Sequence, residues 1–171
     1  MVVTCVFDFQ GREKSAVWLP APEPAETNAE YLVVNWADPA REAALTALAA
    51  RWGPRLLVPE IWRQVLPQAG LLVSSAISGG ELKQRFLDVP SRRCWLLEEP
   101  MCTTFPLPCP TGQGIPASEM PKNAGFYSPA LGCRYTHLPG QVLLFDTEET
   151  MARKRQLAEH CGFLGYLRLP E

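Results

Sequence analysis

Three carboxylates come directly after segments of the chain that are predicted to be strands. These residues are Glu60, Glu98 and Asp146. Two carboxylates that face each other across a cleft can act as general acid and general base on a glycosidic bond. The candidate pairs are Glu98 with Asp146 and Glu60 with Glu98, and we predict Glu98 and Asp146 to be the catalytic residues of such a site.

The same carboxylates have a structural alternative. Asp146 could cap the helix predicted to follow it, because Glu149 lies three residues further on and would complete a capping box. Glu60 could open a short helix, and Glu98 and Glu99 could simply alternate around the end of a strand. Capping explains these acids without any catalysis, so both interpretations stay open.

A ligand-binding set is predicted at the same strand ends, where parallel α/β folds hold their ligands. Within this set, residues 78–80 (Ser-Gly-Gly) follow a strand and would expose backbone N–H groups at the start of a helix, which suits phosphate or sulfate. An ordinary strand-to-helix turn is the alternative, because the lysine and the spacing of a phosphate loop are missing. The predicted ligand-binding residues are Asn35, Glu60, Ser75, Ser78, Gly79, Gly80 and Arg168.

Cysteine and histidine do not follow a metal-binding pattern. Cys102, Cys109, Cys133 and His137 have irregular gaps and no Cys-x-x-Cys pair, so no metal or cofactor is predicted. A catalytic thiol at Cys102 or Cys109, with His137 or His160 as its base, is an equally weak candidate. His160 is better explained by the last turn of a helix, where a positive charge suits the helix dipole.

Several aromatic residues could stack on sugar rings if they were exposed. The alternative is that they belong to the core, and the strand-like surroundings of Trp36, Trp95 and Tyr166 favour it. The candidates are Trp18, Trp36, Trp62, Trp95 and Tyr166.

Length and composition limit the remaining choices. The chain has 171 residues, which predicts a single domain, and its net charge of −2 argues against a nucleic acid or an anionic membrane held by bulk electrostatics. No apolar run approaches the roughly 18 residues that a membrane span needs. Residues 1–8 lack the basic head and small-residue cleavage site of a signal peptide, so the expected location is cytoplasmic and the six cysteines are expected to be reduced.

Strand and helix patterns alternate from residue 30 onward, which predicts an α/β fold of mainly parallel βα units. The clearest unit begins with an apolar strand at residues 142–145, continues with a helix that ends at Gly162, and closes with a strand at residues 163–169. We predict that these two strands are parallel neighbours in one sheet. Residues 101–124 are expected to form a proline-rich loop.

The order of these segments resembles part of the barrel of the family 18 glycoside hydrolases, in particular their spore-cortex and chitinase-like members. The resemblance covers residues 30–171 and implies a partial or reduced TIM-like barrel. The family signature D-x-x-D-x-D-x-E, whose last glutamate protonates the leaving oxygen while the substrate acetamido group assists, is absent from residues 31–38. The segments that carry the resemblance are 32–35 with 38–42, 71–75, 94–100 with 105–108, and 145–169.

Two functions from different classes follow. The first is a non-catalytic binding or structural protein, related to a glycoside-hydrolase-like barrel, with a glycan or a small anion as ligand. The second is a small glycan hydrolase that uses Glu98 and Asp146. The missing acidic signature favours the first. Because a truncated parallel sheet would leave an edge or an apolar face uncovered, self-association into a homo-oligomer is a further prediction.

Overall fold

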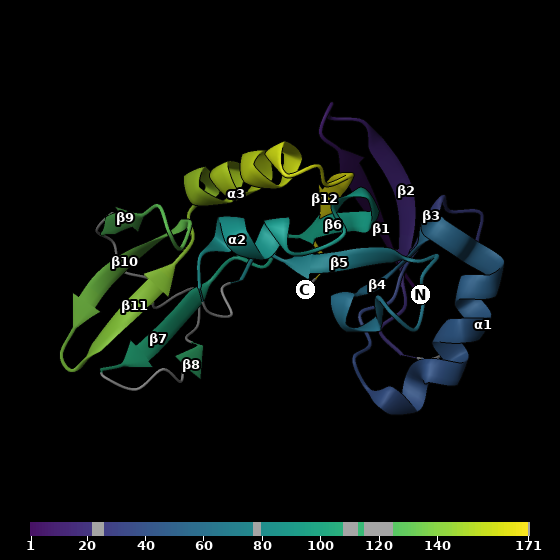
Figure 1. The fold of residues 1–171 in the computed structure, drawn as a ribbon, viewed down its shortest axis with the longest axis horizontal. Coiled ribbons are helices and arrows are strands. Elements are labelled where there is room, and N and C mark those ends of the chain that lie inside the picture. Colours follow the sequence, from purple (N-terminus) through teal and green to yellow (C-terminus); the bar gives the residue numbers. More distant parts are fainter. Residues whose placement is uncertain (22–25, 77–79, 108–112, 115–124, 171) are drawn as a thin grey trace.

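The computed structural model describes residues 1–21, 26–76, 80–107, 113–114 and 125–170. Figure 1 shows two bodies, a closed barrel and a separate sheet, with helices α2 and α3 between them. The barrel strands follow one another in the order β1-β12-β6-β5-β4-β3-β2. Their bounds are β1 Val2–Asp8, β2 Glu13–Trp18, β3 Tyr31–Val33, β4 Leu56–Pro59, β5 Gly70–Ser74, β6 Cys94–Leu97 and β12 Gly165–Leu167.

The barrel has a mixed topology. Parallel pairing runs from β2 through β3, β4, β5 and β6 to β12. Strand β1 closes the barrel by pairing antiparallel with both β2 and β12. A Cβ at Gly165 would collide with the Phe7 carbonyl oxygen and the Trp95 ring, so this closure depends on glycine in β12.

The second body is an antiparallel sheet of five strands in the order β8-β7-β11-β10-β9. It is inserted between β6 and α3, so the chain leaves the barrel after β6, builds this sheet, and returns through α3 to β12. The bounds are β7 Cys102–Pro106, β8 Gln113–Gly114, β9 Phe126–Ser128, β10 Cys133–Leu138 and β11 Gln141–Phe145.

The predicted fold class is therefore wrong. A mixed seven-stranded barrel with a separate antiparallel sheet and few short helices replaces the expected α/β fold of mainly parallel βα units and its TIM-like barrel. The predicted parallel pair is also wrong, because β11 belongs to the antiparallel sheet whereas β12 pairs with β6. Apolar periodicity identifies a strand but does not identify its partner. Part of the predicted loop at residues 101–124 is strand, namely β7 and β8.

Three α-helices lie within the described residues: α1 Glu42–Trp52, α2 Leu82–Leu87 and α3 Glu148–His160. The Asp38-Pro39 pair predicts a helix start, because aspartate suits the cap and proline the first helical position, and the Asp38 side chain does cap a 3₁₀ turn, η1 Pro39–Arg41, that leads into α1. A glycine is also the typical residue at which a helix ends, and Gly53, with φ 57°, ends α1. The short helix predicted after Pro59 is only the 3₁₀ turn η3 Glu60–Trp62; η2 Gly53–Arg55 and η4 Ser91–Arg93 are similar turns.

The apolar runs of the barrel strands fill two separate layers of core. Successive side chains of a strand point to opposite faces, so Leu71 and Leu96 pack outside the barrel against the helices, while Leu72, Trp95 and Leu97 fill its interior. Strands β4, β5 and β6 are buried on both faces, which explains their continuous apolar character.

The core interpretation is confirmed for Trp95, which is buried inside the barrel, while Trp36 and Tyr166 are partly buried and pack against the outer layer. Trp62 is buried in the outer layer as well. No helix among the described residues is long and apolar enough to span a membrane. Because the barrel closes on itself, it has no free edge that would explain self-association, and the homo-oligomer stays a prediction.

Candidate functional site

The carboxyl ends of three adjacent barrel strands bring part of the predicted set together. The Ser75 N–H donates to the Leu97 carbonyl oxygen at 2.9 Å, directly after β5 and β6. The Glu98 N–H donates to the Leu167 carbonyl oxygen at 2.8 Å, directly after β6 and β12. Three of the predicted residues therefore lie next to one another where these strands end, as their position in the sequence predicts. They are Ser75, Glu98 and Arg168.

Helix α3 lies across this region and supplies cations to it. Arg153, Lys154 and Arg155 are consecutive, and successive residues of an α-helix point about 100° apart. Each of the three cations therefore meets a different carboxylate: Arg153 meets Glu149, Lys154 meets Asp146 and Arg155 meets Glu98.

The pair of Lys154 and Asp146 is fully enclosed. Its Nζ–Oδ2 distance is 2.9 Å, and both side chains have 0% relative exposure. Lys154 also donates to the Ser75 carbonyl oxygen at 2.9 Å, which ties α3 to the end of β5. Asp146 accepts two further hydrogen bonds, from the Met101 N–H at 2.8 Å and from the Thr150 hydroxyl at 2.7 Å.

Asp146 is not the N-cap of α3. The N-cap is Thr147, whose hydroxyl accepts from the Thr150 N–H at 3.2 Å, and the Thr150 hydroxyl accepts from the Thr147 N–H at 2.8 Å. The capping box predicted from Asp146 and Glu149 is therefore shifted by one residue. The shift frees the Asp146 carboxylate to accept Lys154.

Glu98 meets two arginines at the edge of the barrel. The Arg155 Nη2 atom lies 2.7 Å from Oε1 and 2.9 Å from Oε2 of Glu98, and the Arg168 Nη2 atom lies 3.4 Å from Oε2. The Glu98 side chain is 3% exposed. The Arg155 guanidinium also stacks over the Tyr166 ring at 4.1 Å, a cation–π contact that fixes its position.

These contacts define what the two predicted catalytic carboxylates can do. A general acid or base must reach a proton of the substrate, whereas each of these carboxylates already faces a cation at hydrogen-bonding distance. Neither residue lines the cleft beside α2 or the cleft between α2 and α3, both of which are described below. The arrangement favours a structural role, and catalysis by Glu98 and Asp146 stays a prediction.

Glu60 and Gly80 lie in a cleft of about 410 Å³ beside α2, which we call the strand-end cleft. Arg85 crosses it, donating to Glu60 Oε1 at 2.8 Å and to the Ser74 carbonyl oxygen. Asn35 follows β3 and is exposed. The predicted residues Ser78 and Gly79 lie outside the described residues. The cleft is lined by Glu60, Arg63, Gly80, Glu81, Gln84, Arg85, Asp88 and Val89.

The cations that complete these contacts were not predicted from the sequence. Lys154, Arg155, Arg63 and Arg85 are not among the predicted site residues.

Two thiols lie in the core beside these sites. Burial raises the pKa of Cys94 to about 12 and the pKa of Cys133 to about 11, so both thiols are protonated at neutral pH. A nucleophilic cysteine needs the opposite shift, toward a lower pKa. The described residues contain no group of three or more His, Cys, Asp or Glu side chains that could hold a metal ion.

Comparisons with known proteins add little to this picture. No family model matches the chain, and no curated protein matches it. One solved structure is similar, a crystal structure described as "putative sporulation-specific glycosylase ydhD from Bacillus subtilis", with 11% sequence identity and a TM-score of 0.48. The match covers 82% of this chain and 65% of that chain. A similarity of this strength carries no argument about the function of this protein.

Proposed function

We propose that this protein is a non-catalytic binding protein that holds a glycan in the strand-end cleft. The observation that carries the proposal is the pairing of both candidate catalytic carboxylates with cations, Asp146 with Lys154 and Glu98 with Arg155. A paired, buried carboxylate is part of the fold, because removing its charge leaves the partner cation uncompensated. The ligand site is assigned to the strand-end cleft because two of the predicted ligand-binding residues, Glu60 and Gly80, line it.

The side chains of this cleft suit a ligand rich in hydroxyl groups. Carboxylates accept hydrogen bonds and guanidinium groups donate them, whereas a hydroxyl group does both. The cleft is lined by both kinds of partner, so adjacent hydroxyls of a sugar ring can each find one. The carboxylates are Glu60, Glu81 and Asp88, and the donors are Arg63, Arg85 and Gln84. Because Arg85 donates to Glu60 Oε1 and Gln84 donates to Asp88 Oδ1, the ligand would pair mainly with Glu81, Arg63 and the second carboxylate oxygens of Glu60 and Asp88.

Binding is tested with a tetramer of N-acetylglucosamine, the sugar type implied by the resemblance to family 18 glycoside hydrolases. Isothermal titration of the full chain should show saturable binding. Replacing the exposed Arg63 (Arg63→Ala) should weaken it about tenfold, because a charge-assisted hydrogen bond is lost. Arg51→Ala, on the exposed side of α1, is the matched control and should bind like the wild type. Equal affinity for both variants would contradict the proposed site.

Catalysis is tested on the same tetramer by following shorter products with mass spectrometry. The proposal expects none from the wild-type protein after prolonged incubation. Product formed by the wild type and lost in Glu98→Gln would contradict the proposal and would establish the alternative, a small glycan hydrolase that uses Glu98.

A further inference from the structure

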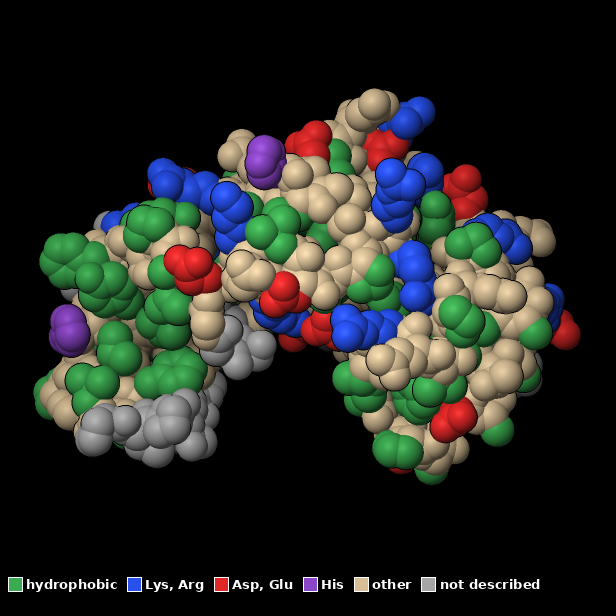
Figure 2. All heavy atoms as spheres, viewed as in Figure 1, with side chains coloured by type: hydrophobic (Ala, Val, Ile, Leu, Met, Phe, Trp, Pro, Cys, Tyr) green, Lys and Arg blue, Asp and Glu red, His purple; other side chains and the backbone are tan. Residues whose placement is uncertain are grey.

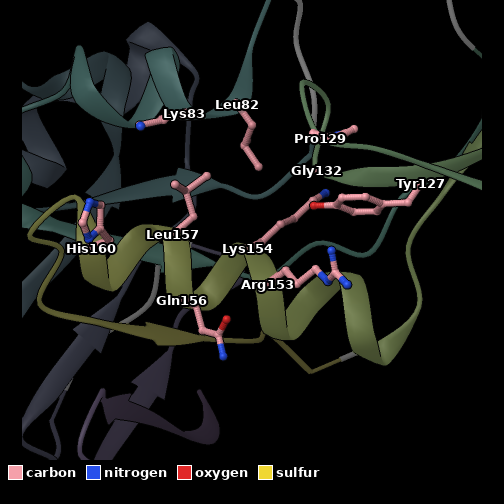
Figure 3. Close-up of a pocket in the computed structure, with 10 residues that line it drawn as sticks. All are labelled: Leu82, Lys83, Tyr127, Pro129, Gly132, Arg153, Lys154, Gln156, Leu157 and His160. Atoms are coloured by element: carbon pink, nitrogen blue, oxygen red, sulfur yellow. The ribbon is translucent and has the colours of Figure 1, made fainter.

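A second cleft, of about 510 Å³, lies between α2, α3 and the turn that joins β9 to β10. We call it the α2–α3 cleft. Its volume is within the range of small-molecule sites, roughly 300–1,000 Å³. Figure 3 shows its residues: Lys83 and His160 lie toward one end, Arg153 and Tyr127 lie toward the other, and Leu157 lies between them.

The α2–α3 cleft carries an excess of positive charge. Its described lining residues include the cations Lys83 and Arg153 and no carboxylate, while the ammonium of Lys154 faces Asp146. The whole chain has a net charge of −2, so this excess is a local feature rather than a property of the bulk surface. Figure 2 shows Lys and Arg side chains over the middle of this face, interspersed with Asp and Glu side chains. A cleft lined by one sign of charge concentrates ligands of the opposite sign.

Arg153 is held in position at the mouth of this cleft. Its guanidinium lies 4.5 Å from the centre of the Tyr127 ring and 3.0 Å from a Glu149 carboxylate oxygen. Hydrogen bonding to Tyr127 raises the pKa of Arg153, so the side chain stays charged. A planar guanidinium with several N–H groups can pair with an oxyanion through two parallel hydrogen bonds. The exposed Glu149 is a weak competitor for it.

The wall of the α2–α3 cleft is apolar. The Lys154 ammonium is turned away toward Asp146 and Ser75, so its methylene stem lines the cleft in place of its charge. Gly132 has φ 71°, and a Cβ there would come within 2.8 Å of the Leu82 Cδ2 atom. Glycine at this position therefore lets the turn pack directly on α2. Leu82 and Leu157 offer apolar surface next to the cations.

We propose that the α2–α3 cleft binds a small organic oxyanion, either a phosphate monoester or a carboxylate, with an apolar body. The charged group pairs with Arg153 or Lys83, and the body lies on Leu82 and Leu157. This site is separate from the strand-end cleft, so the proposal goes beyond glycan binding and does not depend on it. Phosphate and carboxylate share the chemistry that the cations recognise, and the experiment distinguishes them.

The test uses the full chain labelled with ¹⁵N and four probes at low salt: phenyl phosphate, benzoate, inorganic phosphate and benzyl alcohol. Phenyl phosphate or benzoate should shift the amide signals of residues 82–83, 127–132 and 153–160 saturably, and the tighter of the two identifies the oxyanion. Inorganic phosphate should bind at least several-fold more weakly than phenyl phosphate, because it lacks the apolar body. Benzyl alcohol, which has the body without the charge, should not saturate the site.

Variants tie the signal to the cations. The double variant Lys83→Gln with Arg153→Gln should lower the affinity at least tenfold, while Arg51→Gln on α1 should leave it unchanged. Both cleft residues are exposed, so an unchanged thermal unfolding midpoint will show that the variant folds. The absence of saturable shifts, or equal affinity of the double variant and the wild type, would overturn the proposal. Equal affinity for inorganic and phenyl phosphate would overturn its apolar part.

Discussion

Helix α3 turns Lys154 toward the junction of barrel and sheet and turns Arg153 toward the α2–α3 cleft. These neighbours carry the same charge, and each faces a carboxylate at about the same distance, 2.9 Å for Asp146 and 3.0 Å for Glu149. Their surroundings differ completely: the first pair has 0% exposure at both side chains, while the second has 51% and 67%. Burial, rather than residue type or distance, therefore decides which pair stabilises the fold and which remains available to a ligand.

Substitution in the buried pair of Asp146 and Lys154 should give the largest loss of stability. Asp146→Asn leaves Lys154 buried without a counter-charge, so we expect a loss of about 3–5 kcal/mol of unfolding free energy. Urea denaturation followed by circular dichroism measures it. The double variant Asp146→Asn with Lys154→Met removes both charges and should recover much of the loss. If the double variant is as unstable as the single one, the loss comes from the hydrogen bonds of Asp146 and not from the ion pair.

Glu98 offers an intermediate case, because its carboxylate is buried but its two arginines are partly exposed. Glu98→Gln should cost about 1.5–3 kcal/mol in the same denaturation experiment, the range for hydrogen bonds that involve a charged group. Arg168→Gln is the matched control and should cost less, since its distance to Glu98 is 3.4 Å and Arg155 remains in place. A larger effect for Glu98→Gln than for Asp146→Asn would contradict the ranking by burial.

The stability of the protein should depend on pH through the buried thiol of Cys133, which lies near Lys154 and Asp146. Because burial raises the pKa of Cys133 from 9.0 to about 11, the folded state keeps this proton over a range in which the unfolded state releases it. Stability should therefore fall as the pH rises from about 9 toward 11. Urea midpoints at pH 8, 9 and 10 measure the fall, which should be less steep in Cys133→Ala than in the wild type. Identical slopes would show that the thiol does not contribute.

The sequence predicted individual elements better than their assembly. Apolar runs located β5, β6 and β11, and Asp38 and Gly53 marked the start and end of the first helical segment, because these signals depend on neighbouring residues. The partner of β12 could not be predicted in this way. Its parallel neighbour β6 lies about seventy residues earlier in the chain, at Trp95 for Gly165, and an entire sheet is inserted between them.

The candidate site was predicted in the same uneven way. Ser75, Glu98 and Arg168 were expected at strand ends and do lie together there. The partners of the carboxylates were not predicted, because Lys154 reaches Asp146 and Ser75 only after α3 has docked. Local spacing even suggested a cap at Asp146, whereas Thr147 takes that position. Charge pairing across the fold depends on tertiary structure, and a single sequence carries little information about it.

Substitution of Arg153, whose side chain is half exposed, should change the free energy of unfolding least and the affinity for the ligand most. Arg153→Gln removes only exposed contacts, with Tyr127 and Glu149, so the urea midpoint should stay within experimental error of the wild type. The same variant should weaken phenyl phosphate binding severalfold, because the guanidinium that pairs with the oxyanion is lost. Glu149→Gln keeps Arg153 and removes its competitor, so it should leave binding unchanged or strengthen it. A stability loss in Arg153→Gln as large as that in Glu98→Gln would show that the two faces of α3 share one structural role.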